Sequence, residues 1–154
     1  MKTKAFLTVL GIYLIAYSSQ AQDTIQIGTT GSRKDLFPVS AYNNYAWTDQ
    51  IYLQNEITEA GIITEIALNS LSYYGTSIPD FTTNNQRIFL KHTAETSFAD
   101  GTYPDTLTME QSFTGDITWP LSDIETWHYI KLDTPFYYNN IDNLEILYEN
   151  RDGS

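Results

Sequence analysis

The sequence contains no cysteine. A chain without cysteine cannot be held together by disulfides, and it cannot use a thiol nucleophile or a zinc–thiolate site. Its stability must therefore come from a packed core alone.

Long hydrophobic runs are also scarce, and the clearest one lies at the N-terminus. Residues 5–16 are apolar, a short basic segment precedes them, and Ser19-Gln20-Ala21 then places small residues before Gln22. This order is typical of a cleaved signal peptide, and the run is shorter than the roughly 20 residues that span a bilayer. We therefore expect residues 1–21 to be removed, a secreted or cell-surface location, and no membrane span after cleavage.

Positively charged residues are also few. The chain has 8 Lys and Arg against 19 Asp and Glu, and cleavage after residue 21 would remove two lysines and no acid, which leaves a formal charge of −13. Such a surface repels nucleic acid and anionic lipid, which argues against both as partners. The acidity favours solubility, with cation binding as the sharper alternative.

The remaining 133 residues (154 less 21) are rich in Tyr, Thr, Ile and Leu, which favour strands, and they have the size of one domain, 22–154. Short alternating segments are separated by Gly, Pro, Asn and Asp, with no convincing helix. This pattern predicts an all-β fold, an antiparallel β-sandwich of the jelly-roll type. The predicted strands are residues 23–28, 50–53, 62–73, 86–93, 107–113, 127–132 and 144–149.

Three of these segments allow a more detailed prediction. The segment 62–73 is almost continuously apolar, which predicts a central strand, with a bulge as an option and with Ile62, Ile66 and Leu68 on one face.

Alternation predicts the inward faces of the other two segments. It points Ile88 and Leu90 inward in 86–93 and places His128, Ile130 and Leu132 together on the apolar-facing side of 127–132. Trp127 is expected to belong to the core as well.

The C-terminal residues form a turn signal, Asn150-Arg151-Asp152-Gly153-Ser154, directly after the buried strand predicted at 144–149. An Asp-Gly pair typically joins two strands of a hairpin, and no second strand follows here. We therefore predict that the domain lacks its last strand or strands and belongs to a longer chain.

Several short motifs follow one another between Ile27 and Tyr148: Ile27-Gly28, Phe37-Pro38, Gln50-Ile51-Tyr52, Glu56-Ile57, Ala60-Gly61, Phe113-Thr114-Gly115, Trp127, Pro135-Phe136 and Asn143-Leu144-Glu145-Ile146. In this order they resemble a β-sandwich module of secreted and surface proteins of Bacteroidetes-type bacteria. The resemblance implies a jelly-roll-like module of a multidomain protein, often one exported by type IX secretion, with neighbouring domains as its partners. It implies no ligand, because function depends on sites rather than on folds.

No motif for catalysis is present. His92 and His128 are the two histidines, and neither accompanies a G-x-S-x-G elbow or an H-E-x-x-H motif. We therefore predict strand residues rather than catalytic ones, and no enzyme. Carboxylate pairs suited to glycoside hydrolysis stay open at this point, because 19 acids offer many pairs.

Acidic residues on predicted loops are the candidates for a metal. Asp100, Asp105 and Asp152 supply the oxygen ligands that calcium prefers, but their spacing is not that of an EF-hand loop. The alternative is that these side chains cap turns. No other cofactor is predicted.

The binding hypothesis concerns an aromatic segment, which we predict to be a loop. Tyr42, Tyr45 and Trp47 could stack on sugar rings or anchor a protein partner. The sequence thus predicts a non-catalytic extracellular module with a structural, adhesion or protein- or glycan-binding role. The alternatives are a carbohydrate-binding module of a polysaccharide-degrading enzyme and a hydrolase fragment.

Overall fold

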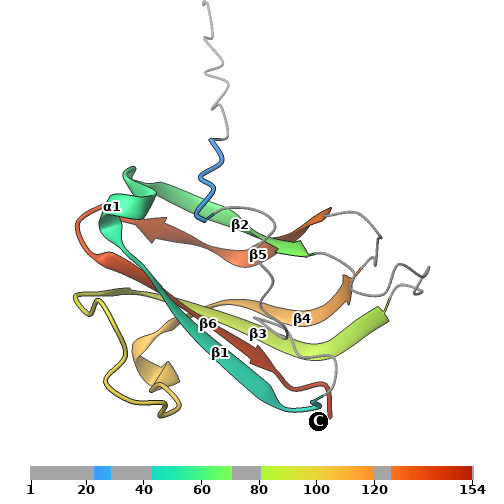
Figure 1. The fold of residues 1–154 in the computed structure, drawn as a ribbon. Coiled ribbons are helices and arrows are strands. Elements are labelled where there is room, and N and C mark those ends of the chain that lie inside the picture. The colour runs from blue at the N-terminus through green and yellow to red at the C-terminus, as the bar shows by residue number, and fades with distance from the viewer. Residues whose placement is uncertain (1–22, 29–42, 71–80, 120–125, 154) are drawn as a thin grey trace, which may run out of the picture.

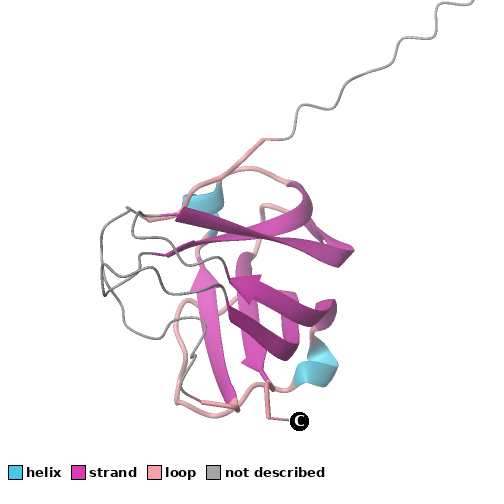
Figure 2. Ribbon diagram, turned by 90° about the vertical axis from the view of Figure 1, so that its right-hand side faces the viewer, coloured by secondary structure: helices cyan, strands magenta, loops and turns pink. Residues whose placement is uncertain are grey.

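The computed structural model describes residues 23–28, 43–70, 81–119 and 126–153, and its strands form two antiparallel sheets packed face to face (Figures 1 and 2). Sheet A consists, in spatial order, of β1 (Ala46–Tyr52), β6 (Asn143–Asn150), β3 (Phe81–Thr93) and β4 (Glu110–Trp119). Sheet B consists of β2 (Gly61–Ser70) and β5 (Thr126–Tyr138). The predicted all-β sandwich is confirmed. The predicted signal peptide, residues 1–21, and Tyr42 lie outside the described residues.

The strand pairs are nested, as in a long hairpin that has been rolled up. Strand β1 pairs with β6, β2 with β5 and β3 with β4, all antiparallel. An eight-stranded jelly roll has a fourth, innermost pair. Here residues 94–109 connect β3 to β4 instead, with a single 3-10 turn, η1 (Thr106–Thr108). In an eight-stranded jelly roll the innermost pair would stand between β3 and β4, where this chain has the 94–109 connection. The predicted absence of a last strand stays a prediction.

The core lies between the two sheets and follows from alternation along the strands. Its buried members include two residues from each of four strands: Ile88 and Leu90, Ile117 and Trp119, Ile130 and Phe136, Leu144 and Tyr148. The inward faces predicted for 86–93 and 127–132 are confirmed. Alternation sends Trp127 to the outer face of sheet B, where its side chain is 37% exposed, so the prediction that it belongs to the core is wrong.

A bulge in β2 changes which of its residues face the core. The register with β5 shifts between Ile63 and Glu65. Because an odd offset moves a side chain to the other face, Ile63 packs against the core together with Ile66 and Leu68, whereas Ile62 is exposed. Grouping Ile62 with Ile66 was therefore wrong. Among the described strands β2 pairs with β5 alone, so the central positions belong to β6 and β3.

Several predicted boundaries also change. Residues 23–28 form no strand, although Ile27 packs against the core. Strand β1 starts before residue 50 because its whole length pairs with β6. Strand β4 starts at Glu110 because η1 precedes it, and β3 begins at Phe81, ahead of the predicted strand 86–93. One short helix, α1 (Gln54–Ile57), forms a single turn after β1.

Candidate functional site

One row of side chains crosses all four strands of sheet A. The register aligns Trp47 of β1 with Glu149 of β6, Glu149 with Arg87 of β3, and Arg87 with Thr114 of β4. The strand neighbours of Glu149 and Arg87 lie in the core, so the row itself faces outward. At about 4.8 Å between strands, the row is about 14 Å long. We call these four residues, together with Tyr103, the Trp47 surface.

The first end of the Trp47 surface is aromatic. Tyr103, from the 94–109 connection, meets Trp47 edge to face with ring centroids 5.7 Å apart and an interplanar angle of 81°. Both rings remain accessible, with 39% of Trp47 and 42% of Tyr103 exposed, and the neighbouring Tyr45 is exposed as well. The prediction that Trp47 lies on a loop is wrong, because the ladder to β6 already includes it.

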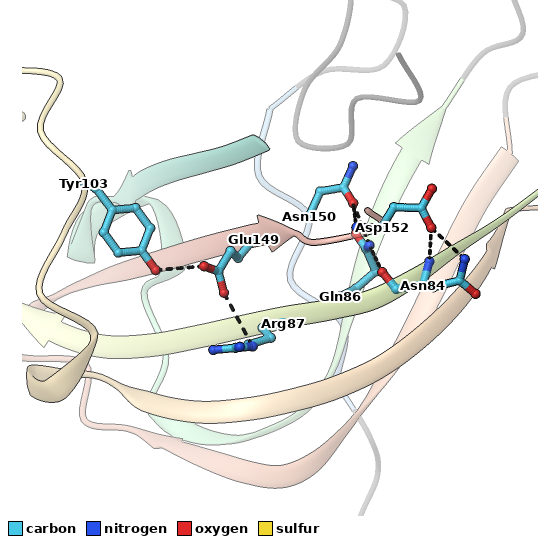
Figure 3. Close-up of polar contacts among 7 residues, drawn as sticks. All are labelled: Asn84, Gln86, Arg87, Tyr103, Glu149, Asn150 and Asp152. Carbon is cyan, nitrogen blue, oxygen red and sulfur yellow. Dashed lines mark hydrogen bonds and ion pairs between the residues drawn. The ribbon is translucent and has the colours of Figure 1, made fainter. Parts of the chain in front are cut away.

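The middle of the Trp47 surface is charged (Figure 3). The Tyr103 hydroxyl donates to Glu149 Oε1 at 3.0 Å, and Glu149 Oε2 lies 3.6 Å from Arg87 Nε. Burial, and next the hydrogen bond to Glu149, raise the pKa of Tyr103, so this hydroxyl stays a donor at neutral pH. Glu149 Oε2 is buried and accepts no hydrogen bond from the described residues. An ion pair and a hydrogen bond therefore lie directly beside the aromatic rings.

The second end of the Trp47 surface opens into a polar hollow of about 330 Å³. It is lined by Asn85, Arg87, Thr114 and Arg151, and so it contains both arginines of the described residues. The Asn85 backbone N–H donates to Asp116 Oδ1 at 3.0 Å, which holds the β3–β4 bulge beside it. The row thus runs from two rings in edge-to-face contact to a hollow with guanidinium, amide and hydroxyl groups.

The turn after β6 supports the start of β1. The Gly153 N–H donates to the Asn44 carbonyl at 3.1 Å. A Cβ at Gly153 would lie 2.7 Å from Asn44 Cβ and 2.8 Å from the Tyr45 ring, so this close approach requires glycine. The turn therefore fixes the aromatic segment that leads into Trp47.

Of the three aspartates predicted as calcium ligands, Asp100 and Asp105 cap turns, as in the alternative, whereas Asp152 binds Asn84 in β3. Asp100 Oδ1 accepts from the Thr102 N–H at 2.9 Å, and Asp105 Oδ1 accepts from the Leu107 N–H at 3.0 Å. Asp152 Oδ1 accepts from both the backbone and the side-chain nitrogen of Asn84, at 2.6 and 2.7 Å (Figure 3). Within the described segments no three His, Asp or Glu residues lie close enough together to hold a metal ion. The calcium site stays a prediction.

Both histidines lie in strands and make structural contacts. His92 Nε2 accepts from the Asn139 N–H at 3.1 Å, and its ring stacks with Tyr138 at 5.9 Å. His128 faces inward against Trp119, with ring centroids 5.6 Å apart, and burial lowers its pKa. The structure thus places both where strand residues were predicted.

Sequence reasoning missed an acidic pair, Asp49 and Glu145, which lies under the 94–109 connection. Glu145 is buried on the outer face of sheet A and lies 2.9 Å from Lys91 Nζ. Burial, and next the charge of Glu145, raise the pKa of Asp49 to about 6. The alternating pattern of β6 indicates that Glu145 points outward. Its burial could not be predicted from this pattern, because it depends on the path of the 94–109 connection.

The raised pKa of Asp49 predicts a pH-dependent stability. Because its pKa rises from 3.8 to about 6 on folding, the folded chain binds more protons than the unfolded chain in this window, and stability falls as pH rises through it. Asp49→Asn should therefore raise the free energy of unfolding at pH 7 by about 1 kcal/mol, a value reduced for solvent screening of a half-buried group, and leave it unchanged at pH 3. Urea unfolding at both pH values measures this. An equal change in the free energy of unfolding at pH 3 and pH 7 would contradict the prediction.

Comparison with known proteins adds no assignment. No model of a protein family matches the sequence, and no curated protein or solved structure is significantly similar to it. The helical turns of the described residues are too short and too polar to cross a membrane. The arrangement of the site therefore carries the functional argument.

Proposed function

We propose that this chain is a non-catalytic β-sandwich module of an exported protein and that its Trp47 surface binds a neutral glycan. The observation that supports this is the row from Trp47 through Glu149 and Arg87 to Thr114, which places two accessible rings beside an ion pair and a polar hollow on one sheet face.

The chemistry of the row matches that of a sugar chain. A pyranose ring has a face of C–H groups, which packs on an aromatic ring, and a rim of hydroxyls, which need donors and acceptors. Trp47 and Tyr103 offer the ring surface, Arg87 offers donors, and the exposed Thr114 hydroxyl offers both a donor and an acceptor. A short oligosaccharide lying across the strands would contact all of them in order. The largely buried Glu149 holds Arg87 and Tyr103 in place.

The charge of the chain decides between classes of glycan. A formal charge of −11, or −13 after removal of the signal peptide, repels acidic polymers over several ångströms. The ligand is therefore a neutral glycan. Export, a surface location and neighbouring domains in a longer chain, as in the Bacteroidetes-type modules, form part of the same proposal and rest on the sequence. A protein ligand at the same surface is the competing interpretation.

Removing the ring of Trp47 tests the proposal. Isothermal titration against neutral oligosaccharides (glucans, mannans and xylans) should show binding, and Trp47→Ala should weaken it at least tenfold because the stacking surface is lost. Trp127→Ala is the matched control, since this tryptophan is 37% exposed against 39% for Trp47 but lies on sheet B. No binding to any oligosaccharide of the panel, or an equal loss of affinity in both variants, would contradict glycan binding at the Trp47 surface.

A further inference from the structure

The outer face of sheet B carries a concentration of exposed apolar side chains. Tyr129 is 63% exposed, Tyr137 62% and Ile62 67%, and the partly exposed Trp127 lies beyond Tyr129 on the same face of β5. Clusters of this kind mark interaction surfaces on soluble proteins. This face points away from sheet A, and hence away from the Trp47 surface (Figure 2).

We infer that this face binds the same face of a second copy of the chain, because its two strands complement each other in size. Bulky residues lie on β5, and smaller ones stand opposite them on β2: the register pairs Tyr129 with Ala67 and Trp127 with Asn69. In the dimer, a two-fold axis lies in the interface, parallel to the strands and midway between β2 and β5. This axis places each β5 face to face with the β2 of the other subunit. Tyr129 then covers Ala67 of the partner subunit, and Tyr137 covers Ile62 of the partner subunit.

Charge follows the same symmetry. Lys131 stands opposite Glu65 in the middle of the face, and both side chains are exposed. The axis along the strands brings Lys131 over Glu65 of the partner subunit, twice per dimer. A two-fold axis perpendicular to the strands would instead bring Lys131 over Lys131 of the partner subunit, and Glu65 over Glu65 of the partner subunit. The charges therefore select the arrangement that also matches large side chains with small ones.

The size of the face sets the strength of the dimer. Two strands about 10 Å wide and about 33 Å long give a flat area of about 300 Å². Stable complexes bury about 800 Å² per partner, so the dimer is weak, and it forms only at micromolar concentrations or above. Both Trp47 surfaces remain exposed in it, on opposite sides, so that a dimer could bind two glycan chains.

Sedimentation equilibrium of the purified chain over about 10 µM to 1 mM tests the inference. We expect Glu65→Lys and Lys131→Glu each to weaken the dimer at least tenfold, and an equimolar mixture of the two, or the double exchange, to restore it. Net charge alone predicts the opposite for Glu65→Lys, because this change makes an acidic chain less acidic. Glu110→Lys, an identical change at an exposed position of sheet A, is the control for that effect.

Three outcomes would overturn the inference. The first is a chain that stays monomeric at every concentration. The second is a Glu65→Lys variant that associates as readily as Glu110→Lys. The third is a monomeric chain whose Tyr129→Ala variant loses affinity for glycan, because this result would assign the face to glycan binding. All substituted side chains are exposed, and unchanged thermal transitions would verify folding of the variants. Trp47→Ala should leave the dimer intact, so the failure of one proposal can be distinguished from that of the other.

Discussion

Replacing Gln86 with leucine is expected to lower the free energy of unfolding by about 3 kcal/mol. Gln86 is fully buried in β3 and all of its polar atoms are used. Its Nε2 donates to Asn150 Oδ1 at 2.8 Å and to the Asn84 carbonyl (Figure 3). Its Oε1 accepts from the Tyr148 hydroxyl at 3.0 Å. Leucine would leave the buried Tyr148 hydroxyl without this acceptor, and it would remove one of the donors to Asn150 Oδ1, which also accepts from the Asp152 N–H.

The effect should extend to the start of β1. Asn150 Nδ2 also donates to the Asn43 carbonyl at 2.9 Å, just before the aromatic segment that leads into Trp47. We therefore expect Gln86→Leu to weaken glycan binding as well as stability. Burial strongly raises the pKa of Tyr148, so its hydroxyl remains protonated and needs an acceptor at all ordinary pH values.

Urea or thermal unfolding measures the loss, with two variants as controls. Gln111→Leu makes the same chemical change at an exposed position of β4 and should alter stability by less than about 0.5 kcal/mol. Adding Tyr148→Phe to Gln86→Leu should recover part of the loss, because it removes the orphaned hydroxyl. Equal losses for Gln86→Leu and Gln111→Leu would show that the network contributes nothing.

Replacing Lys91 with methionine should also cost about 3 kcal/mol. Lys91 Nζ lies 2.9 Å from Glu145 Oε1, and Glu145 is buried beneath the 94–109 connection. Methionine keeps most of the packing of the lysine stem but removes the ammonium. A buried carboxylate without its counter-charge is costly, and the neighbouring Asp49 adds to the repulsion when it is ionised.

The double variant Lys91→Met/Glu145→Met separates loss of charge pairing from loss of packing. Because an apolar pair of similar volume often replaces a buried ion pair without cost, the double variant should be much more stable than Lys91→Met alone. Chemical unfolding at pH 7 provides the comparison. A double variant as unstable as the single one would indicate that the loss comes from packing and not from the unpaired charge.

The class of fold could be predicted from the sequence because it depends on local patterns. Alternation at 86–93 and 127–132 identified the inward residues correctly, since side chains on a strand change face at every residue. The same rule failed at Ile62, where one bulge reversed the faces, and at 107–113, where η1 replaced the start of the strand. Bulges and short turns depend on the partner strand, which the local pattern does not contain.

The candidate site could be predicted only in part. Tyr45 and Trp47 were identified because aromatic side chains near a turn are candidates for binding whatever the fold. Glu149 and Arg87 join Trp47 only through the pairing of β1 with β6 and of β6 with β3, which are distant in sequence. No local pattern marks either charge as belonging to a site.

The sequence by itself determined the composition-dependent properties: an all-β chain without disulfides, a strongly acidic surface and the predicted export. These follow from residue types, which act in the same way wherever the chain places them. Only the tertiary structure decided that β6 lies between β1 and β3, that the 94–109 connection returns across sheet A, and that Trp127 faces outward. Strand pairing and loop paths depend on contacts between distant residues, and these contacts bring Tyr103 to Trp47 and bury Glu145.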